Sequence, residues 1–145
     1  MVRQGQTILV ADDEWEVREL VRTILEWENY TVVEAKDGEH ALAQAQATQP
    51  DLILLDVRMP KMNGLDVLEH LQADPTLASI PVVMLSVLTN YPQVGTALRN
   101  GATAYLPKPF EIPEMARLVK RVLAGDAARR EAIRQHALKT LVDLW

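Results

Sequence analysis

The chain alternates short runs of apolar residues with longer segments in which apolar residues recur at helical spacing. The clearest apolar runs are Ile8 to Ala11, Leu52 to Leu55 and Val82 to Leu85. Parallel strands that helices cover on both faces have this pattern, because neither face of such a strand meets water. Weaker signals at Tyr30 to Ala35 and Ala104 to Leu106 bring the number of predicted strands to five.

Four segments between and after these strands show apolar stripes typical of helices. The stripes comprise Val17, Leu20, Val21, Ile24 and Leu25; the shorter Ala41, Leu42 and Ala45; Leu65, Leu68 and Leu71; and Met115, Leu118, Val119 and Val122. Glycine and proline mark the joints, and no long structureless stretch remains. The expected fold class is α/β, with an open, doubly wound sheet of five parallel strands.

Length and composition limit the class of protein. With 145 residues, 48% of them hydrophobic, the chain has room for one domain with a continuous core. It has no cysteine, no apolar run that could cross a bilayer and no basic-then-apolar leader, so we expect a soluble, cytoplasmic protein without a membrane partner. A net charge of −5 and a pI near 5.2 argue against direct nucleic-acid binding, which needs clustered Lys and Arg.

Chemically capable residues follow the predicted strands at the ends where a doubly wound sheet binds its ligands. Asp12 and Asp13 follow the first strand, Asp56 ends the third, Ser86 ends the fourth and Lys108 follows the fifth. In this class of fold these strand ends converge on one pocket. Three carboxylates there would repel one another unless a hard cation such as Mg²⁺ or Mn²⁺ neutralised them. The pocket is therefore suited to phosphoryl chemistry.

Asp56 is the best candidate nucleophile, because it sits at the edge of the central strand. A carboxylate can attack a phosphoryl donor and form an aspartyl-phosphate. Phosphoryl transfer asks little covalent chemistry of a protein, so the metal and the Lys108 ammonium would stabilise most of the charge. The Ser86 hydroxyl can donate to a further phosphoryl oxygen.

The order and spacing of these motifs resemble the receiver domain of response regulators (CheY-like) in bacterial two-component signalling, over about residues 6 to 124. The matching stretches are Asp12-Asp13, Asp56 to Gly64 (DVRMPKMNG), Leu85-Ser86, Gly101-Ala102 and Tyr105 to Phe110 (YLPKPF). The resemblance implies the flavodoxin-like strand order 2-1-3-4-5. It also implies a sensor histidine kinase or a phosphotransfer protein as phosphoryl donor.

The resemblance also implies the metal ligands. Asp13, Asp56 and the main-chain carbonyl of Arg58 would bind the cation directly, and Asp12 would act through water. Mg²⁺ commonly keeps several waters in this way.

A second set of implied roles concerns the switch. Lys108 would bind the phosphoryl group, and the Lys108-Pro109 bond is expected to be cis. Ser86 would move to hydrogen-bond the phosphoryl group, and Tyr105 would turn inward behind it, remodelling an output face formed by the fourth helix, fifth strand and fifth helix. Val87 departs from the small residue usual after the Ser or Thr, and its branched side chain could narrow the access of water to the aspartyl-phosphate.

Each motif alone has a simpler interpretation. Asp13 could be a helix N-cap, the stretch that starts at Asp56 a turn, Ser86 a satisfied strand-end hydroxyl and Lys108 a solvated loop cation. Tyr105 could be a core aromatic. Their roles depend on the complete set.

The set predicts a phosphorylation-activated signalling switch that assists its own phosphorylation and dephosphorylation, and not a turnover enzyme. A hydrolase with an aspartyl-phosphate intermediate is one rival, but such enzymes carry an Asp-x-Asp motif after the first strand, whereas Asp12 and Asp13 are adjacent. A phosphorylation-independent interaction scaffold is the other, although such domains usually lack part of the acid set.

The C-terminal segment extends beyond the predicted receiver domain. We expect the receiver over residues 1–124 and a helical extension over residues 125–145, with Asp126 as a candidate cap. The extension carries a stripe that needs a partner surface, formed by Ile133, Ala137, Leu141 and Leu144 and widened by Leu138, Val142 and Trp145. Packing on the domain, a homodimer contact and a signalling helix towards an output module all remain open, as does the question of a stand-alone regulator or a fragment.

Overall fold

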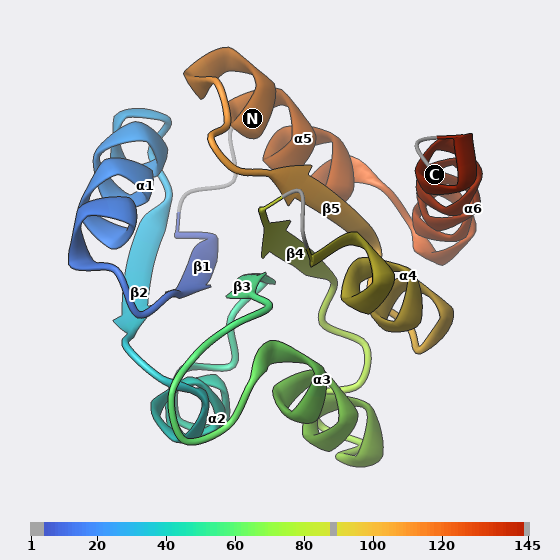
Figure 1. Ribbon diagram of the computed structural model, residues 1–145. Helices are drawn as coiled ribbons and strands as arrows, with labels where there is room; N and C mark the ends of the chain where they lie inside the picture. The colour runs from blue at the N-terminus through green and yellow to red at the C-terminus, as the bar shows by residue number, and fades with distance from the viewer. Residues whose placement is uncertain (1–4, 88–89, 144–145) are drawn as a thin grey trace.

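The chain folds into one parallel five-stranded sheet with helices on both faces (Figure 1). The computed structural model describes residues 5–87 and 90–143, with side chains up to residue 141. The strands are β1 (Thr7–Ala11), β2 (Thr31–Ala35), β3 (Leu52–Asp56), β4 (Val82–Ser86) and β5 (Ala104–Pro107). The helices are α1 (Trp15–Trp27), α2 (Gly38–Thr48), α3 (Gly64–Ala73), α4 (Tyr91–Arg99), α5 (Ile112–Ala124) and α6 (Ala127–Asp143). The strand order is β2-β1-β3-β4-β5, so the predicted fold class and strand order are confirmed.

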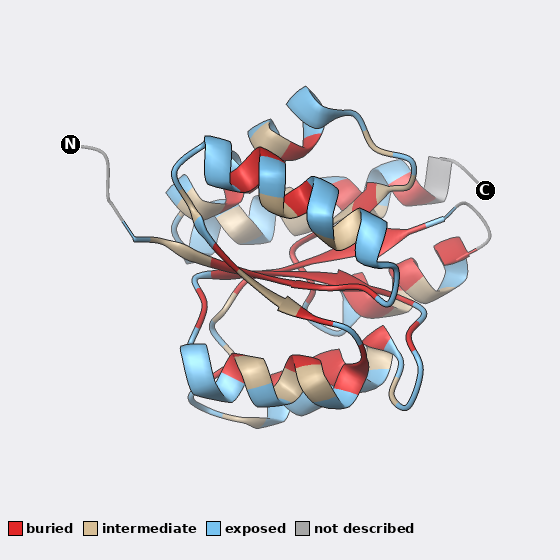
Figure 2. Ribbon diagram, turned by 90° about the vertical axis from the view of Figure 1, so that its left-hand side faces the viewer, coloured by how far each residue is buried: buried red, intermediate tan, exposed pale blue. Residues whose placement is uncertain are grey.

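Two hydrophobic layers cover the two faces of the sheet, which Figure 2 shows edge-on between them. Alternate residues of a strand point to opposite faces. Leu9 therefore enters the layer under α2, α3 and α4, while Val10 enters the layer under α1 and α5. Every residue of β3 and β4 is buried, which explains why these strands have no polar side before their final residues.

The structure has a helix, α4, in a segment for which the sequence pattern predicts no stripe. Pro92 lies in its first turn, where proline is tolerated, and Gly95 interrupts its middle. Tyr91, Val94 and Leu98 form its buried side. Their spacing is helical, but the proline and the glycine around them are typical of a loop.

The predicted C-terminal helix is present as α6, and it packs on the outer side of α4 and near β5 (Figure 1). Asp126 caps it, since its Oδ1 accepts a hydrogen bond of 2.9 Å from the Arg129 amide. Ala137 and Leu141 of the predicted stripe are buried. Leu144 and Trp145 lie outside the described residues, and the side chain of Val142 is not described.

None of the helices in the described ranges is long and apolar enough to cross a membrane.

Candidate functional site

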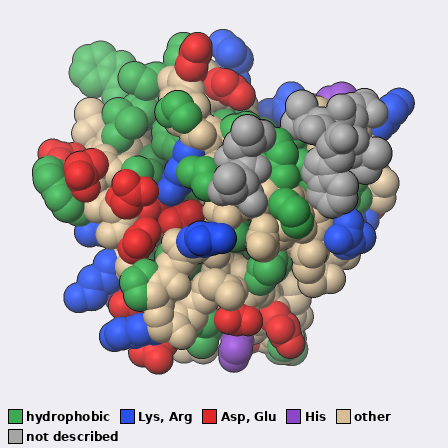
Figure 3. All heavy atoms as spheres, in the orientation of Figure 1, with side chains coloured by type: hydrophobic (Ala, Val, Ile, Leu, Met, Phe, Trp, Pro, Cys, Tyr) green, Lys and Arg blue, Asp and Glu red, His purple; other side chains and the backbone are tan. Residues whose placement is uncertain are grey.

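The ends of four strands bring the predicted site residues together. One carboxylate oxygen from each of Asp12, Asp13 and Asp56 lies within 4.8 Å of the others. The Lys108 ammonium is 2.6 Å from Asp12 Oδ2 and 3.4 Å from Asp56 Oδ1. The main-chain amide of Lys108 donates to the carbonyl of Ser86, which joins the ends of β4 and β5. Acidic side chains with basic neighbours gather on the face shown in Figure 3.

Close packing behind Asp56 fixes the end of β3. A Cβ atom on Gly64 would lie 2.2 Å from the main-chain oxygen of Asp56, so only glycine fits there. The Gly64 amide donates to the Val57 carbonyl at 2.8 Å. Asn63 caps α3 by accepting a hydrogen bond of 2.9 Å from the Asp66 amide. The Asn63-Gly64 pair is thus a helix start that also holds the backbone of Asp56 in place.

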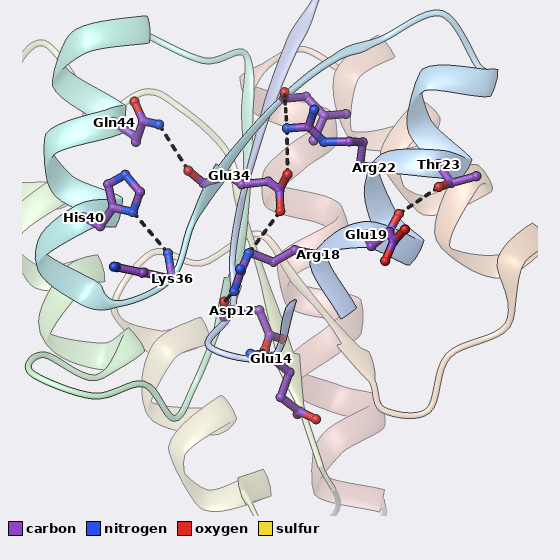
Figure 4. A network of polar contacts seen from close by, with 11 residues as sticks. Asp12, Glu14, Arg18, Glu19, Arg22, Thr23, Glu34, Lys36, His40 and Gln44 are labelled. Carbon is purple, nitrogen blue, oxygen red and sulfur yellow. Dashed lines mark hydrogen bonds and ion pairs between the residues drawn. The ribbon is translucent and has the colours of Figure 1, made fainter. Parts of the chain in front are cut away.

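Arg18 of α1 holds the loop that carries the acid pair (Figure 4). Its Nη1 donates to the Asp12 carbonyl at 2.8 Å, and its Nε donates to Glu34 of β2 at 3.0 Å. The Glu14 amide donates to Asp12 Oδ1 at 2.9 Å. Glu14, not Asp13, occupies the N-cap position of α1, so the interpretation of Asp13 as a helix cap is wrong. The Asp13 side chain is exposed at the mouth of the site.

The electrostatics of the site favour a cation beside Asp56. Burial and the nearby Asp12 carboxylate raise the pKa of Asp56 to about 7, although the Lys108 ammonium acts in the opposite direction. Burial would lower the pKa of Lys108, but Asp12, Asp56 and Glu14 together raise it above its usual value. The single ammonium therefore offsets only part of the negative charge.

Asp56→Asn is expected to stabilise the metal-free protein most at alkaline pH. The folded pKa near 7 exceeds the unfolded value of 3.8, so the cost of ionising Asp56 in the folded state grows between these values. The gain in unfolding free energy should be larger by about 2.5 kcal/mol near pH 8 than near pH 5, because one pKa unit corresponds to about 1.4 kcal/mol. Urea titrations in EDTA at the two pH values measure the unfolding free energy. The control is Asp66→Asn, which makes the same substitution at an exposed position. A gain independent of pH would contradict this assignment.

The residues present fit a hard divalent cation and a phosphoryl group. Three carboxylates offer oxygen ligands, and a hollow of about 360 Å³ opens beside Asp13, Arg58 and Asn63. The buried Ser86 Oγ has no hydrogen-bond partner among the described residues. A buried hydroxyl usually has such a partner, so this donor is available for an oxygen of a bound group.

Besides the bond from Arg18 to the Asp12 carbonyl, sequence reasoning did not identify two further contacts around the site. Arg58 Nε donates to Asn90 Oδ1 at 3.1 Å, although only the main-chain carbonyl of Arg58 was assigned a role. Glu14 Oε1 lies 3.8 Å from the Lys108 ammonium. Because Glu14 directly follows the acid pair in the sequence, its position could have indicated this contact. Asn90 occupies the N-cap position of α4, the helix that the sequence pattern did not identify.

The structure confirms the predicted cis bond and places Tyr105, whose predicted switch role stays a prediction, against α4. Tyr105 is half-buried, and its ring meets that of Tyr91 edge-on, with 5.9 Å between the ring centroids. The Lys108-Pro109 peptide bond is cis, as expected. Val87 is 43% exposed beside Ser86.

Comparisons with known proteins agree with this geometry. Residues 8–120 match the family described as Response regulator receiver domain. The DNA-binding dual master transcriptional regulator RpaA of Synechocystis sp. is 40% identical over 116 residues, which cover 80% of this chain and 48% of RpaA. The chain spans about half the length of the curated relatives it matches.

Two solved structures are similar in fold. The chemotaxis protein CheY4 of Vibrio cholerae has a TM-score of 0.76 and 31% identity, and the match covers 83% of this chain and 99% of CheY4. NtrX from Brucella abortus has a TM-score of 0.77 and 29% identity, and that match covers 98% of this chain, α6 included, but 30% of NtrX.

Proposed function

Because the chain belongs to the response regulator receiver domain family of two-component signalling, we propose that it is a switch that accepts a phosphoryl group on Asp56. The donor is a sensor histidine kinase or a phosphotransfer protein. The observation that carries the proposal is the position of Asp56, which shares its pocket with two other carboxylates and the Lys108 ammonium. The protein is a phosphoacceptor signalling domain. Asp12, Asp13 and Asp56 form its acidic pocket, and Lys108 lies beside them.

In the proposed transfer, an Asp56 carboxylate oxygen attacks the phosphorus of a phosphohistidine. The new P–O bond forms as the P–N bond breaks, and the leaving imidazole retains the electron pair and takes up a proton. Lys108 neutralises charge on a phosphoryl oxygen, and the Ser86 hydroxyl donates to another. Neither Lys108 nor Ser86 forms or breaks a covalent bond in this step, so both act through their position and their charge or hydrogen bond.

Asp13, Asp56 and the Arg58 carbonyl would hold Mg²⁺ or Mn²⁺ directly, and Asp12 would hold it through water. The cation neutralises the carboxylates and charge on the phosphoryl oxygens when it is bound. Arg18 supports this arrangement because it holds the main chain of Asp12.

Ser86 and Tyr105 carry the response in this proposal. Ser86 is fully buried at the end of β4, next to Asp56, and its hydroxyl is free to turn towards a phosphoryl group. Its movement would vacate space for Tyr105, which now contacts Tyr91 of α4. Val87 is the neighbour that would limit the access of water to the aspartyl-phosphate.

Receiver domains interact with histidine kinases, and the curated relatives named above include a DNA-binding regulator. We propose a cytoplasmic protein in which residues 1–124 form the receiver and residues 125–145 extend it towards an output partner or a second copy. We do not assign DNA contact to these residues, since their net charge is −5.

Intact mass after incubation with acetyl phosphate tests the proposed function. The wild-type protein should gain one labile phosphoryl group with Mg²⁺ and almost none in excess EDTA, because three carboxylates repel an incoming phosphate when no cation is bound. Restoring Mg²⁺ after the chelator should restore the gain, which controls for damage to the protein.

A failure to gain mass with Mg²⁺, from acetyl phosphate and from a cognate kinase alike, would favour the phosphorylation-independent scaffold. Steady release of phosphate from phosphate esters would instead favour the hydrolase.

A further inference from the structure

Helix α6 covers part of the surface that α4 and β5 would otherwise present to solvent (Figure 1). Ala137 and Leu141 join the hydrophobic layer that contains Tyr91 and Val94 of α4. Ile133, on a neighbouring part of the helix, packs against the layer under α5. One helix thus bridges two elements that lie on opposite faces of the sheet.

Two arginines attach α6 through main-chain oxygens. Arg134 Nη1 donates to the Leu98 carbonyl near the end of α4 at 2.9 Å, while its other nitrogens pair with Glu131. Arg130 Nε donates to the Val122 carbonyl near the end of α5 at 3.1 Å. Cations near the carbonyl end of a helix are favourable, because the last carbonyl groups have no partner within the helix.

The docked helix nevertheless has a small apolar contact. Only Ala137 and Leu141 are buried among its described side chains, and most of the others are exposed. Leu141 approaches α4 at Gly95, where an added Cβ would lie 3.4 Å from Leu141 Cδ2. Elements with few buried apolar contacts open at low free energy, so we expect undocking of α6 to cost little free energy.

The other end of α4 is tied to the phosphoryl site. Arg58, two residues after Asp56, donates to Asn90, which is 2% exposed and occupies the N-cap position of α4. Tyr91 follows it and meets Tyr105 of β5. The helix α4 therefore contacts the site loop at its start and α6 along its outer side.

We propose that α6 is a docked regulatory helix that is released from α4 and β5 when Asp56 is phosphorylated, so that the surface beneath it becomes available. The inference rests on the proposed function, because it needs a phosphoryl group on Asp56. The phosphoryl group would draw Ser86 and the Arg58 loop towards itself and shift the start of α4. By linkage, docking of α6 must in turn disfavour phosphorylation by the same factor.

Hydrogen exchange of the full chain, resolved to peptides of α6, tests the release. With Mg²⁺ and excess acetyl phosphate, amides of α6 should exchange at least about fivefold faster, the lower end of usual coupling between sites. Asp56→Asn in the same reagents should show no change. Intact mass of each sample gives the phosphorylated fraction. Phosphorylated protein with unchanged α6 exchange would overturn the inference alone, whereas absence of phosphorylation would overturn the proposed function as well.

Arg134→Ala provides a second test through the reciprocal effect. Loss of the bond to Leu98 should weaken docking and raise the equilibrium affinity of the Mg²⁺-loaded protein for beryllofluoride, a reversibly bound analogue of the phosphoryl group, by about fivefold or more. Arg129→Ala is the matched control, because it removes the same charge from an exposed position of the same helix. Equal affinities of the two variants for beryllofluoride would show that α6 docking does not oppose occupation of the phosphoryl site.

Discussion

Replacing Asp56 with asparagine is expected to abolish the gain of a phosphoryl group. The amide lacks the anionic oxygen that attacks phosphorus, and the neighbouring Asp12 and Asp13 do not replace it, because neither ends the central strand beside Ser86. Intact mass after incubation with Mg²⁺ and acetyl phosphate measures the result. Wild type should carry one labile group and the variant none.

The matched control for this variant is Asp66→Asn, which makes the same substitution at an exposed position of α3. It should be phosphorylated like wild type. A variant at position 56 that still gains a phosphoryl group, with a peptide map placing it on Asp12 or Asp13, would show that the acceptor was assigned to the wrong carboxylate.

Lys108→Gln is expected to slow phosphorylation by about a hundredfold while Mg²⁺ still binds. Loss of one charged donor to a reacting oxyanion typically costs about 10²- to 10³-fold in rate. The ammonium lies 2.6 Å from Asp12, so its removal leaves the carboxylates more negative and should preserve or increase affinity for the cation. The time course of intact mass gives the rate, and calorimetric titration gives Mg²⁺ affinity.

Lys61→Gln is the control for charge, since Lys61 is an exposed lysine whose ammonium lies 3.7 Å from Asp37 and, within the described part of the chain, makes no ion pair with a site residue. It should leave both quantities unchanged. A normal phosphorylation rate in Lys108→Gln, or loss of Mg²⁺ binding, would mean that Lys108 does not act on the phosphoryl group.

The sequence allowed the sheet to be predicted because its strands are buried on both faces. The run from Leu52 to Leu55 places no polar side chain on either face of the sheet, and this pattern is typical of a central parallel strand. The helix Tyr91–Arg99 was harder to predict from the sequence, because Pro92 and Gly95 lie inside this short segment. Tertiary contacts with α3, β4 and α6 stabilise it there, and such contacts have no local signal in sequence.

The site was predictable where it depends on strand ends and not where it depends on long side chains. Asp12, Asp56 and Lys108 meet because parallel strands end at one edge of the sheet. The contact between Arg58 and Asn90 spans 32 residues and joins two loops, so it depends on how both loops fold. The bond from Arg18 to the Asp12 carbonyl depends likewise on the placement of α1.

The attachment of α6 has an evolutionary consequence. Arg134 and Arg130 bind main-chain oxygens of Leu98 and Val122, and every residue type offers the same carbonyl. Exposed side chains of α4 and α5 can therefore diverge towards new partners without loosening this anchorage. Paired substitutions between α6 and the two helices are not required to maintain these bonds, so covariation among related sequences would fail to reveal that the three helices are in contact.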